Sequence, residues 1–469
     1  MCLRQDSESM KVTSIDPRTG EIIASFQAAR ASEVLGAVER ARKGQQRWWL
    51  ELTKEERIER LRALESVLAR NKSEVVKTAC LETGIPQASV AAGFDSAMRG
   101  FSYYIGRYEA LQDKPFPLDQ ALWQETNAII HFEPHGVIGH IGVWNYPFWQ
   151  TMITVIPALL TGNSIVFKPS ELATMTGLRI AQLVHEAGIP KDVFVPVIGG
   201  PSVGKALVRS DCDAIVFTGS MSTGQHIIKH AGVKPLVLEL SGNDAGLVCE
   251  DANIEQAARG IASGTFSRAG QVCIRIKRVY VHHHVAEPFL KRLIDITSRL
   301  NVREQIGPLI REEARVRVDK LVQEAVVQGA KALIGGRKME GSGFFYEPTV
   351  LLLTDDQAEV VRKETFGPVC SVRVVQNEEE ALRLANDSDY GLGATIWSTN
   401  VERAAQLASR LQVGNVWINE FGRSLNCGEY FQGCKSSGIA SSQERLMMFL
   451  KKKTVIAHTT SEPRKSWFS

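Results

Sequence analysis

The stretch NSIVFKPSELATMTGLRIAQLVHEAG, residues 163–188, carries the pattern that decides the fold of this chain. Residues 164–167 form a short apolar run, which is typical of a strand buried inside a sheet. Residues 177–188 then place apolar side chains at three- and four-residue steps, which predicts a helix. A short strand followed directly by a helix is the repeating unit of a parallel α/β sheet.

This unit recurs on both sides of the opening stretch. Before Ser241 we predict further strands at 136–144, 192–199, 213–219 and 234–242, with helices at 202–210 and 221–232. After Ser241 a second series begins, with strands at 278–283, 348–353, 368–375, 394–398 and 415–420 and helices at 287–300, 314–331, 378–387 and 401–411. The sequence therefore predicts an α/β fold with two parallel-sheet domains.

The two ends of the chain follow other patterns. The first 110 or so residues have helical periodicity, and Gly84 is expected to end the second long helix. Residues 113–135 read as extended segments, and FLKKKTVIAHTT (449–460) reads as an edge strand protected by lysines. We place one domain at 1–112 and 136–240, the second at 241–430, and separate segments at 113–135 and 445–469.

Bulk composition excludes several classes of function. The 469 residues have a net charge of +3 with basic and acidic residues interspersed, which argues against a nucleic-acid surface. No apolar run approaches the length of a membrane span, and the N-terminus lacks a signal-peptide core. The eight cysteines show no C-x-x-C spacing, so we expect neither disulfides nor a zinc site but a reducing, cytoplasmic location. The histidines 282–284 have no nearby acidic or cysteine partner in sequence, and no metal site is expected.

Two residues stand out as candidates for chemistry. Cys273, in FSRAGQVCIRIKR (266–278), is either a small apolar filler or a nucleophile. Glu239 lies in the apolar strand LVLELSGND, where a carboxylate is costly unless it is paired, hydrated or used. Such a group suits a general base that works near neutral pH.

Several loops after predicted strands offer weaker signals. The G-x-G-x-x-G fingerprint is absent, but Gly219 and Ser220 begin a helix where a phosphate or simple capping would fit. Lys168 and Glu171 are either ribose ligands or a solvated loop pair. Asn145 after its strand is either an oxyanion donor or an ordinary turn residue, and Glu364 has the same ambiguity between a ribose ligand and a loop carboxylate.

Taken together, these motifs resemble the aldehyde dehydrogenase superfamily in order and spacing, from about residue 15 to about 455. The matching pieces are WNYPF (144–148), KPSE (168–171), FTGS (217–220), LELSGND (238–244), GQVC (270–273), ETFGPV (364–369), NVWIN (415–419) and GCKSSG (433–438). The chain departs from the usual family pattern at Val143, at Ser241 and in FQGCKSSGIASSQER (431–445), where the family continues toward Gly-Arg-Glu.

The resemblance implies a role for each candidate. Cys273 would be the nucleophile, Glu239 the general base, and Asn145 with the backbone N–H of Cys273 the oxyanion hole. A Rossmann-like domain (1–112 and 136–240) would bind the cofactor, 241–430 would be catalytic, and 113–135 with 445–469 would be a small β arm for oligomerisation. The residues implied in cofactor binding are Trp144, Lys168, Ser170, Glu171, Gly200, Gly219, Ser220, Glu364 and Phe366.

The implied reaction is NAD-dependent oxidation of an aldehyde to a carboxylate, through a thiohemiacetal and then a thioester on Cys273. NAD is favoured over NADP because Glu171 would repel a 2′-phosphate. A small aldehyde or semialdehyde is favoured, and Arg268 or Arg423 is a candidate for binding a substrate carboxylate. A homodimer or homotetramer is expected. The alternatives are a non-catalytic scaffold of the same fold and a cofactor-independent thiol esterase.

Overall fold

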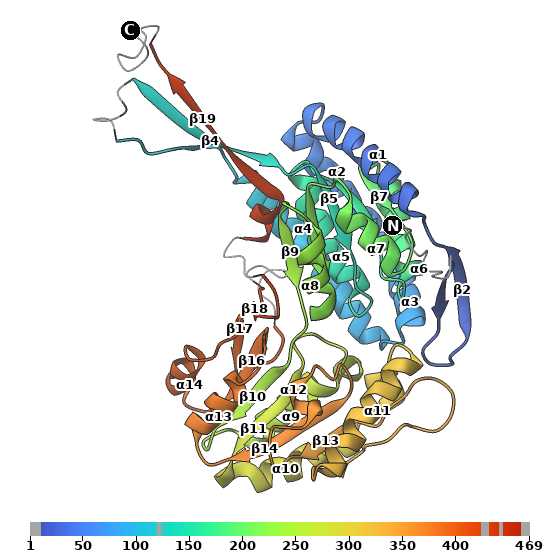
Figure 1. Ribbon diagram of the computed structural model, residues 1–469, viewed down its shortest axis with the longest axis vertical. Helices are drawn as coiled ribbons and strands as arrows, with labels where there is room; N and C mark the ends of the chain where they lie inside the picture. The colour runs from blue at the N-terminus through green and yellow to red at the C-terminus, as the bar shows by residue number, and fades with distance from the viewer. Residues whose placement is uncertain (1–10, 120–122, 124, 424–430, 440–443, 461–469) are drawn as a thin grey trace, which may run out of the picture.

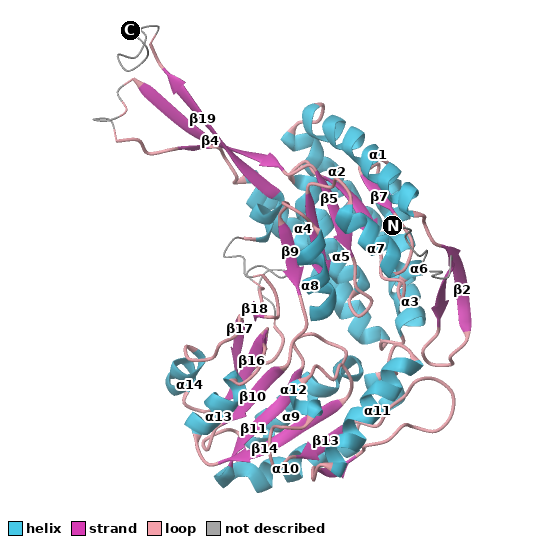
Figure 2. Cartoon of the chain, in the orientation of Figure 1, coloured by secondary structure: helices cyan, strands magenta, loops and turns pink. Residues whose placement is uncertain are grey.

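The computed structural model describes all residues except 1–10, 120–122, 124, 424–430, 440–443 and 461–469. Two α/β bodies lie one above the other, and a β ribbon projects from the upper body (Figure 1). Each body has a central sheet with helices on both faces (Figure 2). The predicted α/β fold is thus confirmed, whereas Cys2, Cys427 and residues 461–469 of the predicted arm lie outside the described residues.

The upper sheet has five parallel strands. In spatial order they are β7 (Phe194–Pro196), β6 (Ser164–Lys168), β5 (Val137–Ile141), β8 (Ala214–Thr218) and β9 (Leu236–Glu239). One face packs against α1 (Ala31–Leu50), α7 (Pro201–Arg209) and α8 (Met221–His230). The other packs against α5 (Pro147–Leu160) and α6 (Thr174–Glu186), with α2 (Lys54–Arg70), α3 (Lys72–Thr83) and α4 (Gln87–Glu109) outside them. Every residue of β5 and β6 is buried, which explains why apolar side chains predominate in both strands.

The lower sheet has seven strands, parallel except at the β12 edge. In spatial order they are β12 (Lys331–Ile334), β13 (Thr349–Leu352), β14 (Val369–Val375), β11 (Ile276–His282), β10 (Asp244–Val248), β16 (Gly393–Trp397) and β17 (Asn415–Ile418). One face is covered by α9 (Ile254–Phe266), α10 (His283–Ser298), α11 (Glu312–Val327) and α12 (Glu359–Arg362). The other is covered by α13 (Glu378–Asn386) and α14 (Val401–Ala408). A short bridge joins β15 (Tyr390–Gly391) to β18 (Cys434–Lys435).

The N-terminal region differs from its predicted all-helical form in two places. Residues before α1 form an antiparallel hairpin of β1 (Lys11–Ile15) and β2 (Ile22–Gln27). The second predicted helix is broken at Asn71, whose side-chain amide donates back to the Val67 carbonyl at 2.8 Å and so separates α2 from α3. Gly84 ends α3 as predicted, in the left-handed conformation that glycine adopts without strain (φ 71°).

The projecting ribbon is built from both predicted outer segments. β4 (Thr126–Pro134) pairs antiparallel with β19 (Leu450–His458) along nine residues and with the short β3 (Lys114–Pro115) on its other side. The 3-10 helix η4 (Arg445–Phe449) leads into β19 and packs on α4 and α5. The predicted C-terminal edge strand is confirmed. No helix in the described ranges is both long and apolar enough to cross a bilayer.

Candidate active site

A cleft of about 1020 Å³ lies where the upper sheet faces the lower one. Its walls come from the carboxyl ends of β5, β6, β8 and β9, the N-terminus of α8, and the loop before β11. Parallel sheets bind ligands at this edge because loops there lead into helix N-termini. The structure brings to this cleft nearly all the predicted site residues: Asn145, Glu239, Cys273, Trp144, Lys168, Ser170, Glu171, Gly219, Ser220, Glu364 and Phe366.

Gly200 is the one predicted residue outside the lining. It lies just before α7 as its N-cap residue, and the wall there is made by Pro201 and Gly204 instead. The sequence indicates only that Gly200 lies at a strand-to-helix junction. It does not indicate which residue of that turn faces the cleft.

Cys273 follows a turn with unusual backbone geometry. Arg268 and Ala269 have φ of 55° and 53°, and Gly270 has φ of 69°. Non-glycine residues in the left-handed region are uncommon, and they cluster at functional sites because the surrounding structure must hold them there. A side chain at Gly270 would collide with the Gly367 carbonyl, which its Cβ would approach to 2.2 Å. This turn therefore delivers the thiol to the cleft in one fixed backbone conformation.

The electrostatic environment keeps the resting thiol protonated. Burial, followed by the negative charges of Glu239, Asp244 and Glu364, raises the pKa of Cys273 well above its ordinary value. Buried Asp244 has its own pKa raised to about 8, chiefly by burial. The thiol thus needs a proton acceptor when it attacks, and Glu239 is close enough to influence its charge.

Asn145 is held by the same turn that positions the thiol. Its Nδ2 donates to the Gln271 carbonyl at 2.9 Å, and an amide nitrogen carries two hydrogens. The second N–H is thus available toward the cleft. The backbone N–H of Cys273 makes no hydrogen bond with any part of the chain that the structure describes. An oxyanion hole requires two such donors, and both residues line the cleft.

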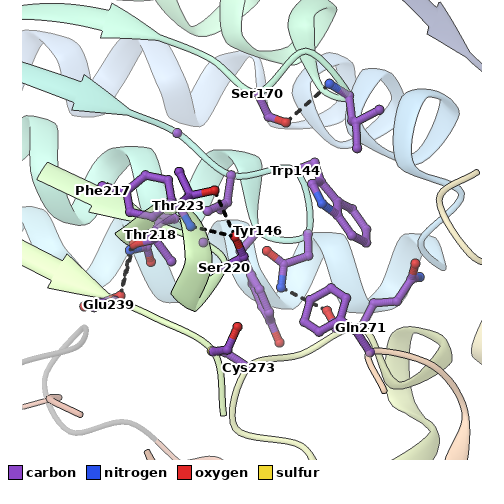
Figure 3. A pocket seen from close by; sticks show the side chains of 18 of the residues that line it. Trp144, Tyr146, Ser170, Phe217, Thr218, Ser220, Thr223, Glu239, Gln271 and Cys273 are labelled. Atoms are coloured by element: carbon purple, nitrogen blue, oxygen red, sulfur yellow. Dashed lines mark hydrogen bonds between the residues drawn. The ribbon is translucent and has the colours of Figure 1, made fainter. Parts of the chain in front are cut away.

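Glu239 ends β9 at the rim of the cleft, and its side chain is 11% exposed. Its Oε2 accepts from the Gln150 side chain at 2.8 Å and from the Thr218 hydroxyl at 3.4 Å. Its Oε1 accepts from the guanidinium of Arg445. Figure 3 shows Glu239 and Thr218 on adjacent strands, with Cys273 on a separate segment of the cleft wall. Burial of the Glu239 carboxylate, which is costly for an unpaired group, is therefore compensated by its ion pair with Arg445 and its hydrogen bonds to Gln150 and Thr218.

Gln150 and Arg445 were not predicted as site residues. Gln150 gave a usable signal, because a long polar side chain interrupts the otherwise apolar run of α5. Arg445 gave none, since it lies 206 residues from Glu239 in sequence.

Lys168 and Glu171 form a pair at the end of β6, with 3.1 Å between Nζ and Oε2. Burial acts to raise the pKa of Glu171, but the charge and hydrogen bond of Lys168 outweigh it and the pKa lies below its usual value. Lys168 is 3% exposed, far more buried than a solvated loop lysine. The pair thus presents a fixed cation and anion to a ligand in the cleft.

The N-terminus of α8 forms the opposite wall of this region. Ser220 caps the helix by accepting from the N–H of Thr223 at 3.3 Å, and Ser222 and Thr223 also line the cleft. Added bulk at Gly219 would meet the Phe217 ring at 2.5 Å, so the chain passes close to that ring. Hydroxyls and helical N–H groups at a helix start suit a phosphate.

At the far end of the cleft, Glu364 links the two bodies. Its Oε1 accepts from the N–H of Gly242 at 3.3 Å, and burial raises the pKa of its carboxyl. The Ser241 hydroxyl also bonds Glu364 and accepts from the N–H of Met221 at 3.3 Å. The cleft therefore presents hydroxyls and helical N–H groups at α8, the Lys168–Glu171 pair at the end of β6, and a carboxylate at Glu364.

The two arginines considered for a substrate carboxylate are placed differently. Arg268 is 5% exposed and donates to the carbonyls of Asn145 (2.6 Å) and Ser89 (2.7 Å), with its guanidinium 3.7 Å from the Tyr146 ring centre. Through these contacts, Arg268 holds the backbone of Asn145 in place. The Arg423 side chain is 82% exposed and lies 3.9 Å from Glu420.

The triple histidine differs from its predicted strand geometry. The strand ends at His282, whose ring nitrogen accepts from the N–H of His284 and caps α10, so the next two histidines are helical. The fold also brings Glu250 from the end of the neighbouring β10 to within 4.8 Å of His282 and His284, a spacing that would admit a metal ion. Glu250 and His284 have 44% and 64% exposed side chains, as in a solvated cluster.

With this geometry in place, comparison with known proteins gives a consistent result. The model of the aldehyde dehydrogenase family matches residues 4–455. The betaine aldehyde dehydrogenase of Bacillus subtilis is 35% identical over 422 residues, 87% of this chain and 86% of that protein. The peroxisomal aminoaldehyde dehydrogenase 1 of Pisum sativum is 33% identical over 471 residues, 97% of this chain and 93% of that protein.

Solved structures agree with the sequence relatives. The crystal structure of betaine aldehyde dehydrogenase from Staphylococcus aureus in complex with NAD+ superposes with a TM-score of 0.92 at 30% identity, covering 98% of this chain and 94% of the other. Lactaldehyde dehydrogenase from Escherichia coli superposes with a TM-score of 0.91 at 29% identity, covering 96% of each chain.

Proposed function

Because this chain belongs to the aldehyde dehydrogenase family, we propose that Cys273, Glu239 and Asn145 carry out the NAD-dependent oxidation of a small aldehyde in the cleft. The observation that supports this most is their convergence: a thiol on a fixed turn, a buried carboxylate and a free amide N–H line one cavity. Upper-body residues 1–112 and 136–240 bind the cofactor, and 241–430 supply the nucleophile.

The chemistry follows from these groups. As Sγ attacks the aldehyde carbon, the Cys273 thiol gives its proton to water in the open cleft, and the oxyanion that forms on the carbonyl oxygen is stabilised by Asn145 and the Cys273 N–H. NAD, when bound, accepts the hydride from the carbonyl carbon and leaves a thioester on Sγ. Glu239 then takes a proton from water as the water oxygen attacks the thioester. The C–S bond breaks, its electrons return to sulfur, and the carboxylate leaves.

Cofactor binding is assigned to the residues that fit each part of NAD. Lys168 and Glu171 hold the adenosine ribose, Ser220 at the α8 N-terminus holds the pyrophosphate, and Glu364 holds the nicotinamide ribose. Trp144 and Phe366, whose ring centres are 5.7 Å apart, form the edge of the cleft beside it.

The activity is tested by following NADH absorbance with a panel of aldehydes that varies in chain length and charge and includes betaine aldehyde and aminoaldehydes. NADH formation with at least one small aldehyde is expected, and it should depend on NAD. Cofactor binding without turnover on any aldehyde would instead favour a scaffold. Ester hydrolysis that is indifferent to NAD, without oxidation, would favour a thiol esterase.

Replacing Asn145 by alanine is expected to lower kcat by about 10²–10³-fold, the usual cost of one oxyanion-hole donor. The affinity for NAD should stay near the wild-type value, because Asn145 is not among the residues proposed to hold the cofactor. Steady-state kinetics and NAD titration by intrinsic fluorescence measure both. A kcat within twofold of wild type would remove Asn145 from the oxyanion hole.

Replacing Glu171 by glutamine is expected to narrow the preference for NAD over NADP roughly tenfold, about 1.4 kcal/mol. The wild-type carboxylate is negative at neutral pH and repels a 2′-phosphate, and this repulsion is what sets the preference. The ratio of kcat/KM for the two cofactors is the measurement. Glu186→Gln, on the exposed end of α6, is a matched control that should leave the ratio unchanged.

We also propose a homo-oligomer and a cytoplasmic location. The ribbon of β4 and β19 exposes apolar side chains, with Ile129 42%, Val455 44% and Ile456 59% exposed, which a second copy would cover. Light scattering should then report a dimer or tetramer rather than a monomer.

The six described cysteines are unpaired, as suits a reducing compartment. Fractionation of the source cells would test this location, which differs from the peroxisomal and chloroplastic plant relatives.

A further inference from the structure

Arg445 is the most unusual charged residue near the site. It begins η4 at the root of the projecting ribbon, and its side chain is only 2% exposed. A buried guanidinium is costly unless its charge is balanced. Its Nη2 donates to Oε1 of Glu239, the proposed general base. The stretch that ends in Arg445 is also where this chain departs from the usual family pattern.

The ion pair lies on the side of Glu239 that faces away from the cleft. A second cavity of about 280 Å³ lies behind β9 and is lined by Arg445, Met447, Met448 and the strand itself. Glu239 lines both cavities, whereas Arg445 lines only the smaller one. The guanidinium therefore neutralises the carboxylate without blocking its access to the thioester.

The remaining contacts of Glu239 leave room for one water. A carboxylate has about four acceptor positions, and three are used by Arg445, Gln150 and Thr218. We propose that Arg445 is a positioning residue for Glu239. The ion pair holds the Glu239 carboxylate in one orientation at the wall between the two cavities, so that the rate of thioester hydrolysis and its pH dependence rest on this contact. This inference rests on the proposed role of Glu239 as general base.

The proton balance explains why a fixed cation is useful there. When water attacks the thioester, its proton moves to Glu239, which becomes neutral. Protonation of Glu239 removes the negative charge that the buried guanidinium of Arg445 faces, which is unfavourable. Return of the proton to bulk water restores the ion pair, so Arg445 favours the reset of the base after each turnover.

Other titratable groups around the pair do not replace Arg445. His140 on β5 stays neutral, since burial, aided by the charge of Arg445, lowers its pKa to about 3. Burial also lowers the pKa of His135 in the smaller cavity. Cys273 faces Glu239 from the cleft as a protonated thiol. The neighbouring pair of Arg107 on α4 with Glu444 is internally balanced and more exposed.

The test compares Arg445→Gln, which removes the charge but keeps a donor, with Arg445→Lys, which keeps the charge. NADH formation is followed by rapid mixing across pH. In Arg445→Gln the initial burst should remain, while the slow hydrolytic phase falls at least tenfold at neutral pH. The acid limb of its pH–rate profile should move to higher pH, the direction expected when an opposite charge is removed from beside a carboxylate. Arg445→Lys should keep the acid limb of the pH–rate profile where it lies in the wild-type enzyme.

A matched control and a second variant make the outcome decisive. Arg107→Gln breaks the neighbouring ion pair and should leave the pH profile unchanged. An unchanged acid limb in Arg445→Gln, or a loss of rate that is the same at every pH, would overturn the proposal. If Arg445→Gln does not fold, the double variant Glu239→Gln/Arg445→Gln, which lacks both charges, should fold and bind NAD. Failure of that variant too would assign Arg445 a packing role and overturn the proposal.

These outcomes are separable from failure of the proposed function. Full steady-state turnover in Glu239→Gln would remove the general base itself. If Glu239→Gln stops after the burst while Arg445→Gln keeps the wild-type acid limb, only the proposed role of Arg445 is excluded.

Discussion

The Cys273→Ala variant is expected to bind NAD normally and to form NADH at least about 10⁴-fold more slowly than the wild-type enzyme, a loss typical of removing a catalytic nucleophile. Without Sγ no thiohemiacetal forms, and direct hydride loss from a hydrated aldehyde lacks the covalent step that the cleft is built to support. Alanine removes the contact of Sγ with the backbone of Ile274 but leaves the preceding turn unchanged, so the fold and the cofactor site should persist.

The measurement is steady-state NADH formation, paired with NAD titration and mass spectrometry of quenched reactions. The wild-type protein should show an acyl adduct on the peptide that contains Cys273, and the variant should show none. Cys434→Ala is the matched control, because Cys434 is also half-buried but lies outside the cleft lining. Retention of even one-tenth of the activity in Cys273→Ala would exclude a covalent route through this residue.

The main parts of the fold could be predicted because their signals are local. The buried strands β5 and β6 are mostly apolar, and each is followed within a few residues by a helix start. Asn145 follows one such strand and Glu239 ends another, so the rule that parallel strands end at one edge brought both to the same cleft, whereas Cys273 lies in the loop before β11. Motif order then gave each residue its expected role.

The parts that could not be predicted depend on tertiary contacts. Nothing near Arg445 in sequence indicates that it contacts Glu239. The contact forms only because η4 brings Arg445 beside Glu239, the last residue of β9. Glu250 and His282 likewise meet only because β10 and β11 are neighbours that end together. The break at Asn71 depends on one side-chain hydrogen bond that helical periodicity does not reveal.

The strained turn before the thiol is a fourth feature that could not be predicted. Ser-Arg-Ala-Gly reads as a plain helix end, yet Arg268 and Ala269 both adopt positive φ. The cause is tertiary, since the Arg268 guanidinium is held by two carbonyls from other segments and by the Tyr146 ring. A residue first considered as a substrate ligand thus fixes the backbone that presents the nucleophile.

The Glu239→Gln variant is expected to release one equivalent of NADH per active site in a burst and then to turn over about 10²–10⁴-fold more slowly, the usual contribution of a general base. Glutamine keeps the shape and the contacts with Gln150 and Thr218 but accepts no proton from water. Attack and hydride transfer can proceed once, and the thioester on Cys273 then persists.

The ion pair with Arg445 adds a structural consequence that must be separated from the chemical one. Removing one partner of a buried pair costs about 3–5 kcal/mol, so Glu239→Gln should also melt at a lower temperature. Adding Arg445→Gln should recover the melting temperature, because no buried charge is left unbalanced, but it should not recover hydrolysis. Rapid-mixing absorbance, intact-mass detection of the acyl adduct and thermal melting together measure both effects. Unimpaired steady-state turnover in the single variant would show that the thioester is hydrolysed by some other base.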